Sequence, residues 1–309
     1  MRLAIFLVLC SLTFSTIAQQ QEENTQQEAS ESKPAEQETA QPKDQSAASG
    51  EQSSPVAEVA PPISVKSLHE HDANWQLSKE ILSPMLVGTE DIITLTQSDA
   101  LALNRGVAVL VPDWHQSVTS PKAINFLRKD LPQKGWTTIT VQPPAKPDNY
   151  PSSASKESQR NTENEQTISS YKEAITPILQ AVFNKAQEYP GVFVVISEGN
   201  NAAIIMDIVQ QQQLPAPNGI VLLSAHMESL SDNLKFAQIM SESDTPVLDL
   251  VLSKDNRWAE HYAPIRKQHA QKALKTFYRQ RQLQNTVTGY YPEKALASAF
   301  KSWLVSTGW

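Results

Sequence analysis

The residues with the most informative spacing form one turn, residues 197–201. Five apolar residues precede this turn and a helical pattern begins at Ala202, so a buried strand is expected to run into a helix. Acyl-transfer enzymes expose a nucleophilic serine on such a turn, in the pattern Gly-x-Ser-x-Gly. The five places of that pattern are taken here by Ser197, Glu198, Gly199, Asn200 and Asn201. Gly199 therefore stands where the reactive oxygen should be.

Two serines are candidates to replace the missing nucleophile. Ser197 points to the same face of the predicted strand as Gly199, but it lies at or before the strand end, which places its hydroxyl inside the sheet. A hydroxyl bonded to the backbone is the structural interpretation of this residue. Ser224 follows the next predicted strand, residues 219–223, and is the second candidate.

Strand and helix patterns alternate along residues 63–309, which we predict to form one domain. The predicted strands are runs of Val, Ile and Leu, and such runs are typical of a mostly parallel sheet with helices on both faces. Strands are expected at 92–96, 106–112, 137–141, 192–196, 219–223, 246–252 and 286–291, and helices at 121–134, 167–189, 202–213, 230–241, 259–281 and 292–305. Residues 145–166 are polar and predict a long loop or a lid.

The order of these elements resembles the α/β-hydrolase superfamily and, more narrowly, the uncharacterised bacterial family DUF3530. The narrower resemblance rests on short segments spread over residues 70–309. They are Arg105-Gly106-Val107, Leu110-Val111-Pro112, Leu127 and Leu131 with Gly135-Trp136, Gly199-Asn200-Asn201-Ala202, Pro246-Val247-Leu248-Asp249, Tyr278-Arg279-Gln280 and Trp303-Leu304. The resemblance implies an α/β-hydrolase fold and, in a working member, a nucleophile, a base, an acid and an oxyanion hole.

The resemblance places the acid just after the late strand, where this sequence has Asp255. The same place suits a turn or helix N-cap residue, and Asp249 within the strand is interpreted as structural. The base should stand between the last short strand and the last helix, but residues 288–292 read Thr-Gly-Tyr-Tyr-Pro. Histidines stand elsewhere, at His226, His261 and His269, where surface or capping roles also account for them.

The loop that would form the oxyanion hole consists of Pro112, Asp113, Trp114 and His115, without the His-Gly pair that is usual there. His69 and His71 form an H-x-H pair with no third ligand nearby, so no metal site is predicted. With nine glycines and no glycine-rich phosphate loop, the sequence predicts no cofactor either.

The first 18 residues have the pattern of a secretory signal peptide. A short basic start, Met1-Arg2, is followed by an apolar run over residues 3–12 and a small-residue site at Ala18. The run has about half of the ~20 residues that a membrane span needs, so the mature chain is expected to have no transmembrane segment and to be periplasmic. The residue before Cys10 is Leu9 rather than a small one, which argues against a lipoprotein.

Residues 19–62 predict a disordered linker, because they are rich in Gln, Glu, Ser and Pro and contain no aromatic residue. Its nine acids and two bases carry a net charge of −7, which equals the net charge of the whole chain. The remainder is thus close to neutral, and nothing favours nucleic-acid binding.

Two hypotheses follow from this sequence. In the first, the chain is an exported α/β-hydrolase-fold protein that has lost catalysis and acts as a binding or scaffolding module for a small molecule or an envelope protein. In the second, it is an esterase-like hydrolase whose site combines Ser197 or Ser224, Asp255, and a histidine such as His226 or His261.

Overall fold

The computed structural model describes residues 62–309. The predicted signal peptide and nearly all of the predicted linker lie outside the described residues. Within residues 62–309, no helix combines the length and the apolar character that crossing a membrane requires.

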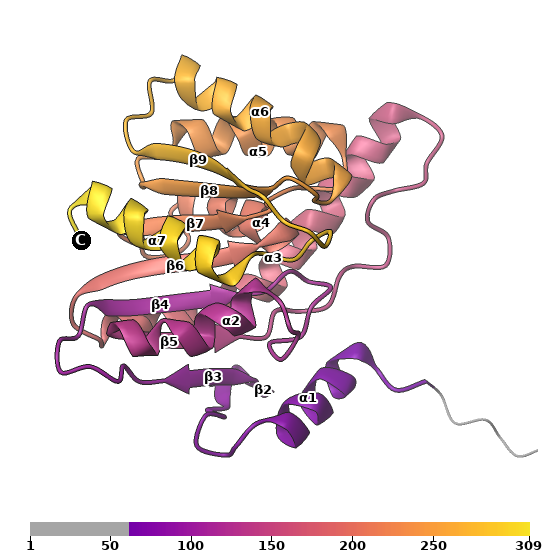
Figure 1. The fold of residues 1–309 in the computed structure, drawn as a ribbon. Coiled ribbons are helices and arrows are strands. Elements are labelled where there is room, and N and C mark those ends of the chain that lie inside the picture. Colours follow the sequence, from indigo (N-terminus) through magenta and orange to yellow (C-terminus); the bar gives the residue numbers. More distant parts are fainter. Residues whose placement is uncertain (1–61) are drawn as a thin grey trace, which may run out of the picture. The chain divides into compact units, whose positions relative to one another are not determined.

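A seven-stranded sheet forms the centre of the domain (Figure 1), as the sequence predicts. The strand order is β3-β5-β4-β6-β7-β8-β9, and only β3 runs antiparallel to its neighbour. The bounds are β3 Thr94–Gln97, β4 Gly106–Val111, β5 Trp136–Val141, β6 Val192–Glu198, β7 Gly219–Leu223, β8 Val247–Leu252 and β9 Tyr278–Leu283. β4 and β7 are buried at every residue, which explains why they are continuous apolar runs, and β8 is equally buried with Asp249 as its one charged residue.

Helices cover both faces of this sheet and create two cores (Figure 1). One core lies between the sheet and α3, α4 and α5, and the other between the sheet and α2 and α7. The helices are α1 Val65–Gln76, α2 Ala123–Asp130, η1 Pro132–Lys134, α3 Glu157–Gln187, α4 Gly199–Gln210, α5 Leu230–Glu242, α6 Arg257–Lys272 and α7 Glu293–Thr307. A separate hairpin pairs β1 Met85–Val87 with β2 Glu90–Ile92.

The loop predicted over residues 145–166 is shorter in the structure, because α3 begins at Glu157. The first ten residues of α3 are mostly strong helix formers such as Glu, Gln and Arg, and they lack the apolar stripe by which a packed helix is recognised. One polar residue anchors this part: Asn164 is 2% exposed and accepts a hydrogen bond of 2.7 Å from the Ser152 N–H. The prediction of an unstructured segment is therefore wrong for residues 157–166.

The last strand, β9, also differs from the expectation. Residues 278–281 fall within the helix predicted at 259–281, but α6 ends at Lys272 and β9 pairs in parallel with β8. The strand predicted at 286–291 is wrong, since these residues form no strand. Five of the six residues of β9, Tyr-Arg-Gln-Arg-Gln, are polar or aromatic because β9 is an edge strand with one neighbour. Charged edge strands are common, since they oppose pairing with other chains, but they do not carry the apolar signal of a buried strand.

Candidate functional site

The turn between β6 and α4 has the backbone of a nucleophile elbow. β6 ends at Glu198 and α4 begins at Gly199 without an intervening loop. Gly199 adopts a φ of +60°, a left-handed conformation that a side chain makes costly. A Cβ atom at this position would lie 2.5 Å from the Cγ atom of Asp113. The site thus keeps the turn but has no space for a serine side chain.

The carboxylate of Asp113 fills the space above Gly199. Its Oδ1 atom accepts hydrogen bonds from the backbone N–H of Asn200 at 2.7 Å and from the Asn200 Nδ2 atom at 3.2 Å. Both residues are buried, and the N-terminus of α4 favours a negative charge there. In a nucleophile elbow, the N–H of the residue after the nucleophile helps to bind the oxyanion. Here that N–H is already bound by a carboxylate of the same chain.

The loop that carries Asp113 is held in place from several sides. Asn201 donates a hydrogen bond of 2.8 Å from its Nδ2 atom to the Pro112 carbonyl and accepts one of 2.9 Å from the Tyr171 hydroxyl. Trp114 is 1% exposed and packs edge-on against the ring of Tyr171. Because these contacts fix both ends of the loop, Asp113 has little freedom to leave the elbow.

His115, the last residue of the same loop, has a different environment. Its side chain is 54% exposed, and its Nε2 atom lies 3.5 Å from a carboxylate oxygen of Glu228. Its exposed ring therefore lies beside the partly buried carboxylate of Glu228, which fits a surface residue better than an oxyanion donor.

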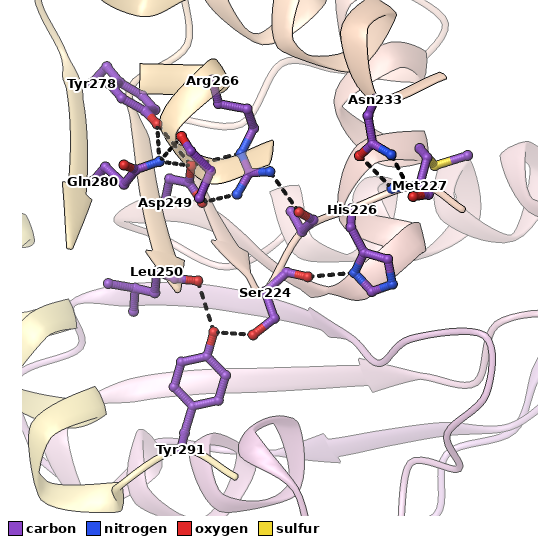
Figure 2. Close-up of polar contacts among 12 residues, drawn as sticks. Ser224, His226, Met227, Asn233, Asp249, Leu250, Arg266, Tyr278, Gln280 and Tyr291 are labelled. Carbon is purple, nitrogen blue, oxygen red and sulfur yellow. Dashed lines mark hydrogen bonds and ion pairs between the residues drawn. The ribbon is translucent and has the colours of Figure 1, made fainter. Parts of the chain in front are cut away.

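At the acid position, Asp255 accepts a hydrogen bond from one hydroxyl group, that of Ser224, which in turn contacts the hydroxyl of Tyr291. Ser224 donates to the Asp255 Oδ2 atom at 2.5 Å, and its Oγ atom lies 2.8 Å from the Tyr291 hydroxyl. The Tyr291 hydroxyl in turn donates to the Leu250 carbonyl at 2.8 Å (Figure 2). Tyr291 thus stands where the sequence lacks the expected histidine. Burial raises the pKa of its phenol well above the ordinary value, so it remains protonated at neutral pH and cannot accept a proton.

The histidines named as candidate bases do not meet a serine hydroxyl. The Nδ1 atom of His226 lies 2.8 Å from the backbone carbonyl of Ser224, not from its Oγ atom (Figure 2). His261 is exposed on α6, where its ring packs edge-on against Tyr262. Ser197 is fully buried and its hydroxyl has no hydrogen-bond partner within residues 62–309, whereas a bond to backbone was expected.

The other histidines do not supply a metal site. His69 and His71 both lie on α1, and His269 lies near the end of α6. Across the described part of the chain, no three His, Cys, Asp or Glu side chains are grouped as metal ligands.

Glu198 is a buried acid, and the sequence pattern identifies it only as the second of the five elbow positions. It is 5% exposed, its Oε1 atom accepts a hydrogen bond of 3.0 Å from Gln116, and its Oε2 atom has no partner within residues 62–309. Burial raises its pKa to about 7, and the nearby charges of Asp113 and Asp255 act in the same direction. Strand alternation could have found it, because Glu198 points to the face opposite Ser197, into the core under α2 and α7.

This raised pKa predicts a pH dependence of stability. The ordinary pKa of the group is 4.5, so between about pH 4.5 and 7 the unfolded chain loses the Glu198 proton while the folded chain keeps it. The stability contributed by the protonated group is therefore lost as pH rises through this window, by on the order of 3 kcal/mol in total. Glu198→Gln should remove this loss and be more stable than the wild type at about pH 8 but not at about pH 4.5.

Urea unfolding of both proteins at several pH values measures this difference. Glu163→Gln is a control of opposite sign, since Glu163 is a partly buried carboxylate on α3 whose pKa is lowered by hydrogen bonds from Ser152 and Gln159. If the free energy of unfolding depended on pH in the same way for the wild type and Glu198→Gln, the raised pKa of Glu198 would be contradicted.

A second buried network, not expected from the sequence, lies behind Ser224. The Asp249 carboxylate accepts hydrogen bonds from Arg266 Nε at 2.9 Å and Nη2 at 3.1 Å, and also from Tyr278 and Gln280 on β9 (Figure 2). Both charged side chains are 0% exposed. The Arg266 Nη1 atom donates to the Ala225 carbonyl at 2.8 Å. The network therefore ties α6 and β9 to the loop that holds Ser224 and His226.

Comparisons with known proteins agree with this architecture. The family model described as "Protein of unknown function (DUF3530)" matches residues 2–305. A comparison with curated proteins finds no match.

Among solved structures, the chain is similar to Est1E from Butyrivibrio proteoclasticus, with a TM-score of 0.52 and 7% identity over 73% of this chain and 98% of that one. It is also similar to a dienelactone hydrolase from Anabaena variabilis, with a TM-score of 0.50 and 10% identity over 73% and 97% of the two chains. TT1662 from Thermus thermophilus has a TM-score of 0.50 and 10% identity over 72% and 97%. At these identities the likeness establishes the α/β-hydrolase fold and nothing about activity.

Proposed function

Because the chain belongs to the DUF3530 family and has the α/β-hydrolase fold, its function must be inferred from its own site, and we propose that it is a non-catalytic binding module. The observation that carries this proposal is the Asp113 carboxylate above Gly199. That carboxylate fills the volume of a nucleophile side chain and also occupies the Asn200 N–H that would help to stabilise an oxyanion.

The acid and base positions support the same conclusion. Asp255 is present, but its carboxylate accepts a hydrogen bond from the Ser224 hydroxyl, and that hydroxyl also contacts the hydroxyl of Tyr291. A protonated phenol cannot take the proton of an attacking hydroxyl, so this set of residues lacks the base that a histidine supplies in the Ser-His-Asp triad.

A second candidate function, an esterase-like hydrolase, is favoured by one observation. The Ser224 hydroxyl lies 2.5 Å from the Asp255 carboxylate at the carboxyl end of β7, and Ser224 has an unusual φ of +48°. In this alternative, Ser224 is the nucleophile and Asp255 accepts its proton directly. Its low accessibility, 7% exposed, and its bond to Tyr291 argue against attack on a substrate.

The experiment that separates the two functions uses purified mature protein. We expect no turnover of short-chain nitrophenyl esters above the buffer rate, and no covalent labelling by a fluorophosphonate probe, because the Ser224 hydroxyl is buried and no histidine within residues 62–309 contacts it. The control is Ser224→Ala, which should give the same background. Labelling of the wild type that is lost in Ser224→Ala would establish the hydrolase instead.

We also propose that the module works in the periplasm. This part rests on residues 1–18 alone, whose basic start, apolar run and Ala18 site are typical of a cleaved signal peptide. N-terminal sequencing of the protein used in the assay tests it, since a mature chain should begin near Gln19. An uncleaved chain would contradict this part without affecting the assignment of the site.

A further inference from the structure

A large cavity lies away from the elbow, on the other side of α4. It has a volume of about 750 Å³ and is lined mainly by α3, α4 and α5. Pockets that bind small organic molecules typically measure about 300–1,000 Å³. Because Asp113 closes the elbow itself, this cavity is a better candidate than the elbow for a ligand of that size.

The floor of the cavity is apolar. Ile204 on α4 and Phe236 on α5 are almost completely buried, and Ile168 on α3 completes the surface between them. Met227, which follows the loop of Ser224, also lines the cavity. An apolar floor of this kind favours a ligand with an apolar body, since burying it removes hydrocarbon surface from water.

The wall of the cavity has a net negative charge. Two ion pairs cross it: Lys172 with Asp207, and Lys235 with Glu165 at 3.7 Å. Two further carboxylates line the cavity, Glu173 and Asp232. Within residues 62–309 neither of these forms an ion pair, so the wall carries two more negative than positive charges.

The two unpaired carboxylates differ in their surroundings. Asp232 is held by the Tyr150 hydroxyl at 2.9 Å and by the Ser229 hydroxyl at 2.6 Å, so its position is fixed. Glu173 is exposed and makes no hydrogen bond through its side chain to residues 62–309. Asp232 lies near the level of Asn161 on α3, because Ser231 bonds to Asn161, whereas Glu173 lies about 18 Å further along that helix. A cationic group of a ligand can therefore meet the adaptable Glu173 while Asp232 adds to the negative potential, and an anionic ligand would be repelled.

We propose that the cavity between α3, α4 and α5 binds an organic cation with an apolar body. This inference rests on the proposed function, in which the chain binds a ligand and does not convert it. The apolar body contacts Ile168, Ile204 and Phe236, and the cationic group lies toward Glu173.

Calorimetric titration of the mature protein tests the proposal with two matched probes, 4-phenylbutylammonium and 4-phenylbutyrate. They share the apolar body and differ in the sign of the charge. We expect the ammonium to bind with a dissociation constant on the order of 0.1–1 mM, and the carboxylate to bind at least about tenfold more weakly. Equal binding of the two probes, tighter binding of the carboxylate, or no binding of the ammonium would overturn the proposal.

Two pairs of positions on α3 locate the site. Ser169 lines the cavity and Ser170 does not, although both are exposed. Ser169→Trp should fill the cavity and weaken ammonium binding about tenfold or more, whereas Ser170→Trp should leave it unchanged. Likewise, Glu173→Gln should reduce the preference for the ammonium, and Glu157→Gln, at the exposed start of α3, should not. Equal effects within either pair would place binding elsewhere.

The outcome is independent of the enzyme assay. Ester turnover together with selective ammonium binding would refute the non-catalytic function but keep the cavity as a site. Absence of both ester turnover and ammonium binding would refute the cavity as a binding site and leave the non-catalytic function in place.

Discussion

Asp249→Asn lowers the free energy of unfolding by about 3–5 kcal/mol, the largest effect that we expect from a single substitution. The substitution leaves the Arg266 guanidinium at 0% exposure without its counter-charge, and the cost of an unpaired buried charge exceeds the energy of one hydrogen bond. It also weakens the bonds that hold Tyr278 and Gln280 of β9. Urea unfolding followed by far-UV circular dichroism measures the loss.

The matched control is Lys66→Ala, which removes an ion pair with Glu90 in which both side chains are more than half exposed. Solvent screens such pairs, so this change should cost no more than about 1 kcal/mol. A double variant, Asp249→Leu with Arg266→Met, should recover much of the stability, because hydrophobic pairs of similar volume often replace buried ion pairs without loss. A small cost for Asp249→Asn, similar to that of Lys66→Ala, would show that the pair is not essential.

Gly199→Ser is the second substitution with a large expected effect. A serine at a φ of +60° costs about 1–3 kcal/mol in backbone strain, and the overlap of its Cβ atom with the Asp113 carboxylate adds a further cost of similar size. We expect a marked drop in the free energy of unfolding and no ester turnover, because Tyr291 cannot act as a base.

A double-mutant cycle separates the two costs. Asp113→Ala removes the carboxylate that overlaps the new side chain, so Gly199→Ser should cost less in the Asp113→Ala background, with a coupling of about 0.5–3 kcal/mol. Additive effects would show that Asp113 does not fill the nucleophile space. Turnover by Gly199→Ser, alone or with Asp113→Ala, would reveal a working base and refute the non-catalytic function.

Much of the architecture could be predicted from the sequence because its signals are local. Runs such as 192–196 and 219–223 are apolar along their whole length only when both faces of a strand are buried, which requires a parallel sheet between two layers of helices. The strand-to-helix turn at Gly199 was visible for the same reason: an apolar run, small residues and a helical period follow one another along the chain.

The bounds predicted from the sequence are wrong for two segments that lack a periodic apolar pattern, β9 and the start of α3. β9 is polar because it lies at the sheet edge, and the first ten residues of α3 are polar because solvent surrounds most of them. In both cases the stabilising contacts come from distant parts of the chain: β8 pairs with β9, and Ser152 bonds to Asn164.

The sequence by itself determined that the elbow position has no nucleophilic side chain, since Gly199 supplies no oxygen, and that no histidine stands between the last strand and the last helix. Only the tertiary structure decided what replaces them. The Asp113 carboxylate reaches Asn200 across 87 positions of sequence, and Ser224 meets Tyr291 across 67. Hydrogen bonds between such distant residues depend on how the ends of neighbouring strands meet at one edge of the sheet, and no local pattern records that distance.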